Sequence, residues 1–143
     1  LKNIIAIAAG INDGLGFGTN SKSALITRGI VEMRRFGALR GAKPETFNGL
    51  SGIGDLITTC VSAHSRNRTL GEEIGKGATL DEVLGRMVMV AEGVPTTRCV
   101  HEYSILHGID MPLTATVHDV LFGGLSPINA VSGLMGRDRK PEH

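Results

Sequence analysis

Aromatic side chains are scarce in this sequence. Its 143 residues include no tryptophan, one tyrosine and four phenylalanines, so that aromatic residues make up 3% of the chain. Large rings therefore cannot dominate the core, although a hydrophobic content of 41% is enough for one ordinary domain of this length. The 20 glycines predict a core of small and aliphatic side chains, in which helix axes approach one another closely.

Cysteine, net charge and long apolar runs are also limited. Cys60 and Cys99 are too few for a disulfide framework, so we expect two reduced thiols in a cytoplasmic protein. A net charge of +1 gives no global attraction for nucleic acid or for an anionic membrane. The longest uncharged apolar run, Ile4 to Ile11, is far shorter than the roughly 20 residues that cross a bilayer. These limits predict a soluble protein with no membrane span and no nucleic-acid partner.

Apolar spacing and capping signals predict an all-α domain. After Thr19, apolar residues recur at helical spacing with charged residues opposite, which is typical of an amphipathic helix of about five turns. Thr79 and Glu82 match a capping box, and Ser126-Pro127 is a typical helix start. No stretch alternates convincingly with the period of a strand. We expect seven to nine helices, with the main segments at 3–11, from 19–21 onward, from 44, at 50–59, 65–76, 79–87 and 94–107, and from 112 and 127.

The glycines near the start of the chain predict a break in its first helix. We expect Gly10, Gly14, Gly16 and Gly18 to end that helix and to form a glycine loop. The chain begins without Met, a charged leader or a cleavage signal, so the sequence predicts an excised fragment. Within it we expect one helical domain over residues 1–136 and a frayed polar tail over residues 137–143.

None of the glycine clusters matches a known phosphate-binding motif. A dinucleotide fingerprint follows a strand and opens a helix, whereas Gly14 to Gly18 follow a helix and have the wrong spacing. They predict a helix-terminating turn instead. The histidines lack metal-ligand spacing, and no G-x-S-x-G nucleophile elbow occurs. We therefore expect no metal site, and no dinucleotide-binding unit within this chain.

The segment Ser65-Arg66-Asn67-Arg68 is the most informative polar feature. At a helix start, free backbone N–H groups and the positive end of the helix dipole favour an anion. The hydroxyl, guanidinium and amide of this segment add further donors, so a phosphate could bind there. The alternative is a capped helix start with a solvated pair of arginines.

Three further residues have both a chemical and a structural interpretation. Asp55 follows glycines that permit close backbone approach and could accept a hydrogen bond from a substrate hydroxyl, or it could cap a helix. Lys2, walled by an apolar helix, could transfer a proton, or it could be an ordinary solvated lysine. Glu92 could reach ribose hydroxyls, or it could interact with a helix dipole.

In their order and spacing, these segments resemble the bacterial NAD(P)-dependent glycerol-3-phosphate dehydrogenases. The resemblance covers essentially the whole chain and implies a helical domain similar to the C-terminal domain of 6-phosphogluconate dehydrogenase. It is carried by Leu1 to Gly10, Gly52-Ile53-Gly54-Asp55-Leu56, Thr59-Cys60, Ser65-Arg66-Asn67-Arg68, Ala91-Glu92-Gly93 and Leu134-Met135-Gly136-Arg137.

The resemblance also implies roles for individual residues. Lys2 would accept a proton when sn-glycerol 3-phosphate is oxidised and donate one when dihydroxyacetone phosphate is reduced. The substrate contacts implied are Lys2, Asp55, Ser65, Arg66 and Asn67, and the cofactor contacts implied are Arg66, Val90 and Glu92.

The family also implies partners that lie outside this chain. NAD(P)H would be bound mainly by an N-terminal dinucleotide-binding domain, which is missing here, so we expect the isolated chain to be inactive. The complete enzyme would be a homodimer that supplies glycerol 3-phosphate for phospholipid synthesis. The preference between NADH and NADPH stays open, because the residues near the ribose 2′ position would belong to the missing domain.

Two other classes of function remain open at this point. A purely structural helical module would use its small-residue helices for oligomerisation, in which case alanine at Lys2 would leave turnover nearly normal. An anion-binding protein without catalysis would show a melting temperature raised by glycerol 3-phosphate, and Arg66→Ala would abolish that shift.

Overall fold

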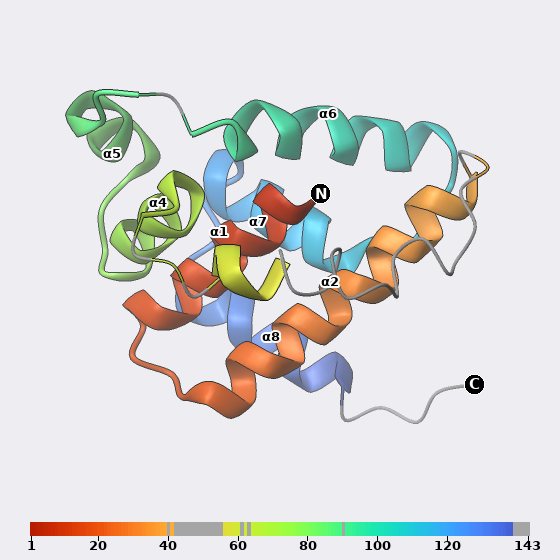
Figure 1. Ribbon diagram of the computed structural model, residues 1–143, viewed down its shortest axis with the longest axis horizontal. Helices are drawn as coiled ribbons and strands as arrows, with labels where there is room; N and C mark the ends of the chain where they lie inside the picture. The colour runs from red at the N-terminus through yellow and green to blue at the C-terminus, as the bar shows by residue number, and fades with distance from the viewer. Residues whose placement is uncertain (40, 42–55, 61, 63, 90, 139–143) are drawn as a thin grey trace.

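The computed structural model describes residues 1–39, 41, 56–60, 62, 64–89 and 91–138. Within these ranges every regular element is helical and no residue lies in a strand, which confirms the all-α prediction. Residues 56–60 are helical. The other helices are α1 (Lys2–Gly14), α2 (Thr19–Leu39), α4 (Arg66–Gly75), α5 (Leu80–Arg86), α6 (Gly93–Leu106), α7 (Pro112–Phe122) and α8 (Pro127–Asp138) (Figure 1).

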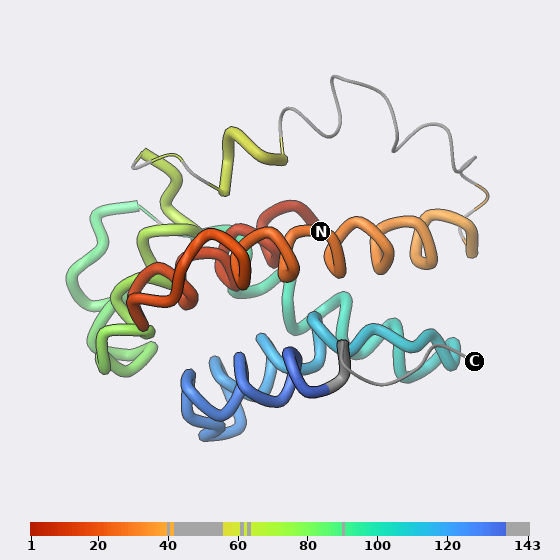
Figure 2. Tube along the Cα trace, turned by 90° about the horizontal axis from the view of Figure 1, so that it is seen from below, coloured from red at the N-terminus to blue at the C-terminus, as the bar shows by residue number. Residues whose placement is uncertain are grey.

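Helix α1 is the central element of the fold. Every residue from Ile4 to Asn12 is buried, because the run of isoleucine and alanine is apolar all round the helix. α1 contacts α2, α4, α6 and α7. In Figure 2, where the molecule is seen from below, α1 and α2 run through the middle, with α7 and α8 on one side and residues 56–60 on the other.

The prediction that Gly10 breaks the first helix is wrong, because α1 continues through Gly10 and ends only at Gly14, the second of the glycines expected to end it. Because glycine has no Cβ, Gly10 and Gly14 allow α1 to cross α4 closely. A Cβ on Gly10 would collide with the carbonyl oxygen of Arg68, and one on Gly71 would collide with the carbonyl oxygen of Ile7. Gly14 and Gly75 likewise face backbone atoms of the opposite helix. Both helices thus carry glycines four residues apart, which lie on one helix face.

The loop between α1 and α2 is held by one buried amide. Gly16, with φ of +78°, makes the turn that was expected there. The side chain of Asn12, which is fully buried, donates to the carbonyl oxygens of Phe17 and Gly18 at 3.3 and 3.4 Å. Its oxygen accepts from the Ser21 hydroxyl at 2.5 Å. Asn12 therefore supplies the polar partners that this tight connection needs.

A buried carboxylate joins α2 to the start of α7. Glu32 is 2% exposed, and its carboxylate accepts from the backbone N–H of Leu113 at 2.5 Å and of Thr114 at 3.0 Å. The Thr114 hydroxyl donates to it as well, at 3.1 Å. Burial raises the pKa of Glu32, although these hydrogen bonds and the positive charge of Arg28 oppose that rise. Glu32 thus caps α7 from a different helix.

The capping signals in the sequence locate several helix starts. The Thr79 hydroxyl accepts from the backbone N–H of Glu82 at 3.2 Å, as the predicted capping box requires. The Ser126 hydroxyl accepts from Asn129 at 3.3 Å at the start of α8. α8 extends through Asp138, two residues past the expected domain boundary. The helix predicted from residue 44 falls outside the described residues, and among the helices described none is both long and apolar enough to cross a membrane.

Candidate active site

A polar pocket of about 600 Å³ brings together residues that are far apart in the sequence. Five of the predicted site residues line it: Lys2, Ser65, Arg66, Asn67 and Glu92. The other two, Asp55 and Val90, lie outside the described residues. The beginnings of α1, α4 and α6 lie at this pocket, because Lys2 begins α1, the 65–67 segment begins α4, and Glu92 immediately precedes α6.

The beginnings of three helices therefore adjoin one pocket. Each helix start presents backbone N–H groups that have no partner within the helix, together with the positive end of a dipole. Neither Leu1 at the start of α1 nor Glu92 at the start of α6 caps its own helix with a side-chain hydrogen bond. With the cationic side chains of Lys2 and Arg66 added, this local charge arrangement favours an anion.

The start of α4 combines a cap with a binding surface. Ser65 is the N-cap, with φ −70° and ψ 119°, and its hydroxyl oxygen accepts from the backbone N–H of Arg68 at 3.2 Å. This confirms the predicted cap, and the hydroxyl proton remains available for a ligand because only the oxygen is used.

The two arginines of this segment have different surroundings. Arg66 lines the pocket, whereas Arg68 turns toward α1 and is not a solvated surface residue. The Arg68 guanidinium contacts Asp13 through Nε at 3.0 Å and Nη2 at 2.9 Å, and contacts Glu72 at 2.9 Å. Asp13 also binds Lys22 of α2 at 2.9 Å. The alternative of a solvated arginine pair is therefore wrong for Arg68, which helps to fix α4 against α1.

The segment between α5 and α6 is attached to the first turn of α4 at two points. Arg66 Nη1 lies 3.0 Å from the sulfur of Met89. Asn67, which is 9% exposed, accepts with Oδ1 from the backbone N–H of Gly93 at 2.8 Å. A thioether is a weak acceptor, so the Arg66 guanidinium keeps most of its hydrogen-bonding capacity for a ligand.

Five further polar residues line the pocket that residue-by-residue reasoning did not select. They come from the second position of α1, from the helical residues 56–60 and from the connection to α4: Asn3, Thr58, Thr59, Ser62 and His64. Their signal in the sequence is weak, because polar and apolar side chains are mixed in the residues before Ser65. Segments of this kind are common at protein surfaces, so only the fold shows that these residues line the same pocket as Lys2.

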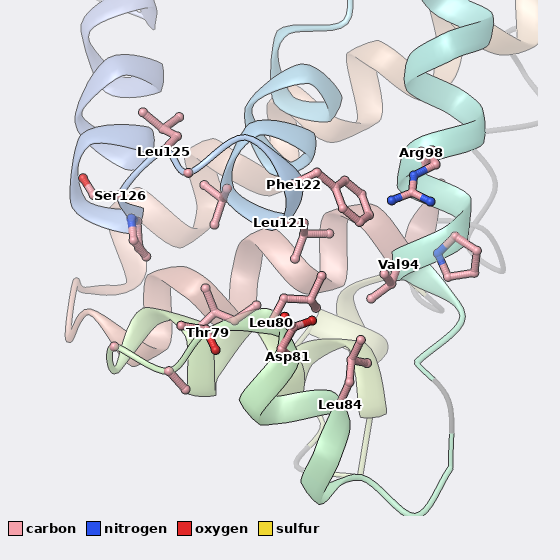
Figure 3. A pocket seen from close by; sticks show the side chains of 17 residues that line it. Thr79, Leu80, Asp81, Leu84, Val94, Arg98, Leu121, Phe122, Leu125 and Ser126 are labelled. Carbon is pink, nitrogen blue, oxygen red and sulfur yellow. The ribbon is translucent and has the colours of Figure 1, made fainter.

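A larger cavity of about 800 Å³ lies elsewhere, between α5, α6 and α7 (Figure 3). None of the predicted site residues lines it. Most of the residues that line it are apolar, and its one cation, Arg98, packs over the ring of Phe122 at 4.3 Å. Size alone therefore does not mark the candidate site, since the convergent donors and charges are in the smaller pocket.

The thiols and histidines give no sign of a metal centre. Both cysteines are free, as predicted: Cys99 is exposed, and burial raises the pKa of the Cys60 thiol to about 11. Among the described residues, no three His, Cys, Asp or Glu side chains are grouped in a way that could hold a metal ion. His101 and His118 stack at 4.0 Å between α6 and α7, away from the pocket.

Comparison with known proteins identifies the fold and then the family. The chain superposes on 42% of the crystal structure of glycerol-3-phosphate dehydrogenase from Coxiella burnetii with a TM-score of 0.91 and 45% identity, using 94% of its own residues. A glycerol-3-phosphate dehydrogenase structure from Plasmodium falciparum gives a TM-score of 0.83 at 29% identity, with all of this chain matching 41% of that one. The fold is therefore that of the helical part of these dehydrogenases.

Sequence relatives agree with that assignment. The chain is 57% identical over 142 residues to "Glycerol-3-phosphate dehydrogenase [NAD(P)+] 2" of Salinibacter ruber, and 58% identical to the corresponding enzyme of Prosthecochloris aestuarii. Both alignments use 99% of this chain but only 41% and 43% of those relatives. The family profile described as "NAD-dependent glycerol-3-phosphate dehydrogenase C-terminus" matches residues 1–132. The chain belongs to this family, as the resemblance implied.

Proposed function

We propose that this chain is the substrate-binding and proton-transferring domain of an NAD(P)-dependent glycerol-3-phosphate dehydrogenase. The complete cytoplasmic enzyme interconverts dihydroxyacetone phosphate and sn-glycerol 3-phosphate, and it supplies glycerol 3-phosphate for phospholipid synthesis. The observation that carries this proposal is the meeting of Lys2, Arg66 and Glu92 in one pocket, since each supplies a different part of the required chemistry.

The substrate phosphate binds at the start of α4 in this proposal. Arg66 supplies a permanent positive charge, and Ser65 and Asn67 supply hydroxyl and amide donors beside the free N–H groups of the first turn. Asp55 is a further substrate contact by resemblance to the family. Binding the phosphate here would position the carbonyl carbon of the substrate for reaction, because remote binding energy can fix the reacting atoms.

Lys2 then acts on the substrate oxygen. During reduction, negative charge develops on the carbonyl oxygen, and the Lys2 ammonium stabilises it and donates a proton. In the reverse direction the neutral amine accepts the proton of the substrate hydroxyl. The Ile4-Ile5 wall behind Lys2 is buried, so α1 holds the lysine backbone rigidly at the edge of the pocket.

The donors and acceptors at the pocket edge also suit a nicotinamide cofactor, which supplies the hydride when bound. The Glu92 carboxylate can accept from ribose hydroxyls, and the Arg66 guanidinium can bind a cofactor phosphate. Val90 is the third cofactor contact proposed by resemblance. In this proposal, the helical domain runs to the end of α8 at Asp138, and a separate N-terminal domain binds most of NAD(P)H. Turnover requires both domains, and the complete enzyme is a homodimer.

Substitution of Lys2 tests the proposal in the complete enzyme. Lys2→Ala removes the proton donor, so we expect kcat for dihydroxyacetone phosphate reduction to fall by about 10³-fold. NADPH oxidation followed at saturating substrate measures this loss, and a melting curve checks that the variant is folded. Lys76→Ala is the matched control, because Lys76 pairs with Glu72 and lies outside the pocket. A Lys2→Ala enzyme that turns over like the Lys76→Ala control would reject the catalytic assignment and favour a structural module.

A further inference from the structure

The start of α6 is capped by a residue from another helix. Glu92 occupies the N-cap position but makes no capping hydrogen bond with its side chain. Instead, the first N–H of the helix, from Gly93, donates to the side-chain oxygen of Asn67 at 2.8 Å in a buried position. Asn67 therefore does for α6 what an N-cap side chain normally does for its own helix.

Close packing around Gly93 allows little freedom at this junction. A Cβ on Gly93 would lie 2.6 Å from the Asn67 side-chain oxygen, 2.8 Å from Ile7 Cδ1 and 3.1 Å from the carbonyl oxygen of Asn3. The carbonyl oxygen of Gly93 accepts from the Thr97 hydroxyl at 2.6 Å. Both polar atoms of the Gly93 backbone are thus engaged, and its Cα is enclosed by α1 and α4.

Glu92 directly precedes Gly93, so the contacts that fix Gly93 also position the Glu92 carboxylate. It lines the pocket, and one peptide bond links it to Gly93. A shift of the Gly93 amide would therefore move the Glu92 side chain directly. The Arg66 contact with Met89 attaches the preceding segment to the same turn of α4.

We propose that Asn67 is a positioning residue for Glu92, in addition to its contact with substrate. The inference rests on the proposed function, in which Glu92 binds the cofactor ribose. The Asn67 oxygen fixes the Gly93 amide and hence Glu92, while its Nδ2 donors serve the substrate. One side chain thus couples the substrate site to the cofactor site, so that loss of Asn67 weakens cofactor binding even when no substrate is present.

A double-mutant cycle on the complete enzyme tests this coupling. The Kd for NADPH is measured by fluorescence, without substrate, for Asn67→Ala, Glu92→Gln and the double variant. We expect about a tenfold weakening for each single variant, since Asn67→Ala leaves the buried Gly93 N–H without its acceptor and Glu92→Gln removes the charge that strengthens the ribose contact. The double variant should bind NADPH no more weakly than Glu92→Gln alone, because Asn67 acts through Glu92.

The measured Kd values distinguish a failure of the positioning role from a failure of the proposed function. The positioning role is overturned if the double variant binds NADPH about a hundredfold more weakly, because the two substitutions then act independently. It is also overturned if the NADPH Kd of Asn67→Ala is unchanged. Neither result contradicts the proposed function. An unchanged Kd in Glu92→Gln shows that Glu92 does not contact the cofactor, which overturns both the positioning role and that part of the proposed function. The Lys2→Ala result is independent of either outcome.

Asn67→Asp provides a second measurement that a general loss of stability would not reproduce. Aspartate keeps the acceptor oxygen for the Gly93 amide but lacks the Nδ2 donors and adds a negative charge near the substrate phosphate. The NADPH Kd of Asn67→Asp should therefore lie closer to the parent value than that of Asn67→Ala. Its KM for dihydroxyacetone phosphate should be the higher of the two. The reverse order for NADPH, with melting curves showing both variants folded, would overturn the proposal.

Discussion

Replacement of Gly71 by alanine should destabilise the protein, although alanine is the better helix former. Gly71 lies on the face of α4 that crosses α1. The new Cβ would collide with the carbonyl oxygen of Ile7 and would lie 2.9 Å from its carbonyl carbon and 3.0 Å from the amide nitrogen of Ile11. These are backbone atoms of a buried helix, so no side-chain rotation can relieve the clash. The two helices must separate instead.

The expected size of the effect follows from two opposing contributions. Overpacking against a rigid neighbour costs about 3 kcal/mol, the upper part of the usual range. The higher helix propensity of alanine relative to glycine offsets about 1 kcal/mol of this cost. The free energy of unfolding should therefore fall by about 2 kcal/mol, which for a chain of this length corresponds to a melting temperature lowered by about 6 °C.

Thermal unfolding followed by circular dichroism at 222 nm measures this change. Gly133→Ala is the control, because Gly133 is in α8 and a Cβ there meets nothing within 4 Å. That variant should melt at the same temperature as the parent or somewhat higher. If Gly71→Ala melted as high as Gly133→Ala, the close approach of α1 and α4 would be refuted.

Two further predictions concern ionisable groups, one that is buried and one that is partly buried. Glu32→Ala leaves the N–H groups of Leu113 and Thr114 without their acceptor, so the free energy of unfolding measured in urea should fall by about 3 kcal/mol. The control is Glu102→Ala, which should change this free energy little because Glu102 is exposed. Burial and the neighbouring His118 lower the pKa of His101, so the folded state favours neutral His101. Stability should therefore decline as pH falls through about 6.5, the pKa of an unfolded histidine, and His101→Phe should decline less between pH 7.5 and 5.5. An equal decline in both proteins would contradict this.

The helix starts were predictable because their signals are local. Thr79 with Glu82, Ser65 before α4, and Ser126 before Pro127 all cap the helices that the sequence assigned to them. The apolar faces gave the all-α class for the same reason, since helical periodicity is visible within one segment.

The pocket was predictable only in part. The resemblance selected Lys2, Arg66 and Glu92, and the fold brings them together, while their roles stay predictions. Thr58 and His64 could not be selected, because nothing local distinguishes a polar surface residue that faces a pocket from one that faces water.

The wrong expectations arose where a residue serves a neighbour distant in sequence. Gly10 was expected to break its helix, since glycine has low helix propensity, but its lack of a side chain is what α4 requires. One of the two interpretations of the 65–68 segment placed Arg68 in solvent, yet Arg68 binds Asp13, which lies 55 positions away in the sequence. Tertiary contacts of this kind override local preference and leave no mark in a single segment.

The glycine crossing of α1 and α4 limits how this pocket could change its ligand. Gly10 and Gly71 fit backbone against backbone, so the helices can neither move closer nor slide smoothly past each other. Lys2 and Arg66 begin those two helices, which makes the separation of their backbones a fixed dimension of the domain. A change in the ligand accepted would therefore have to come from the other residues that line the pocket, such as Thr58, Thr59, Ser62 and His64, which could be exchanged while the two helices that carry the cations stay in place.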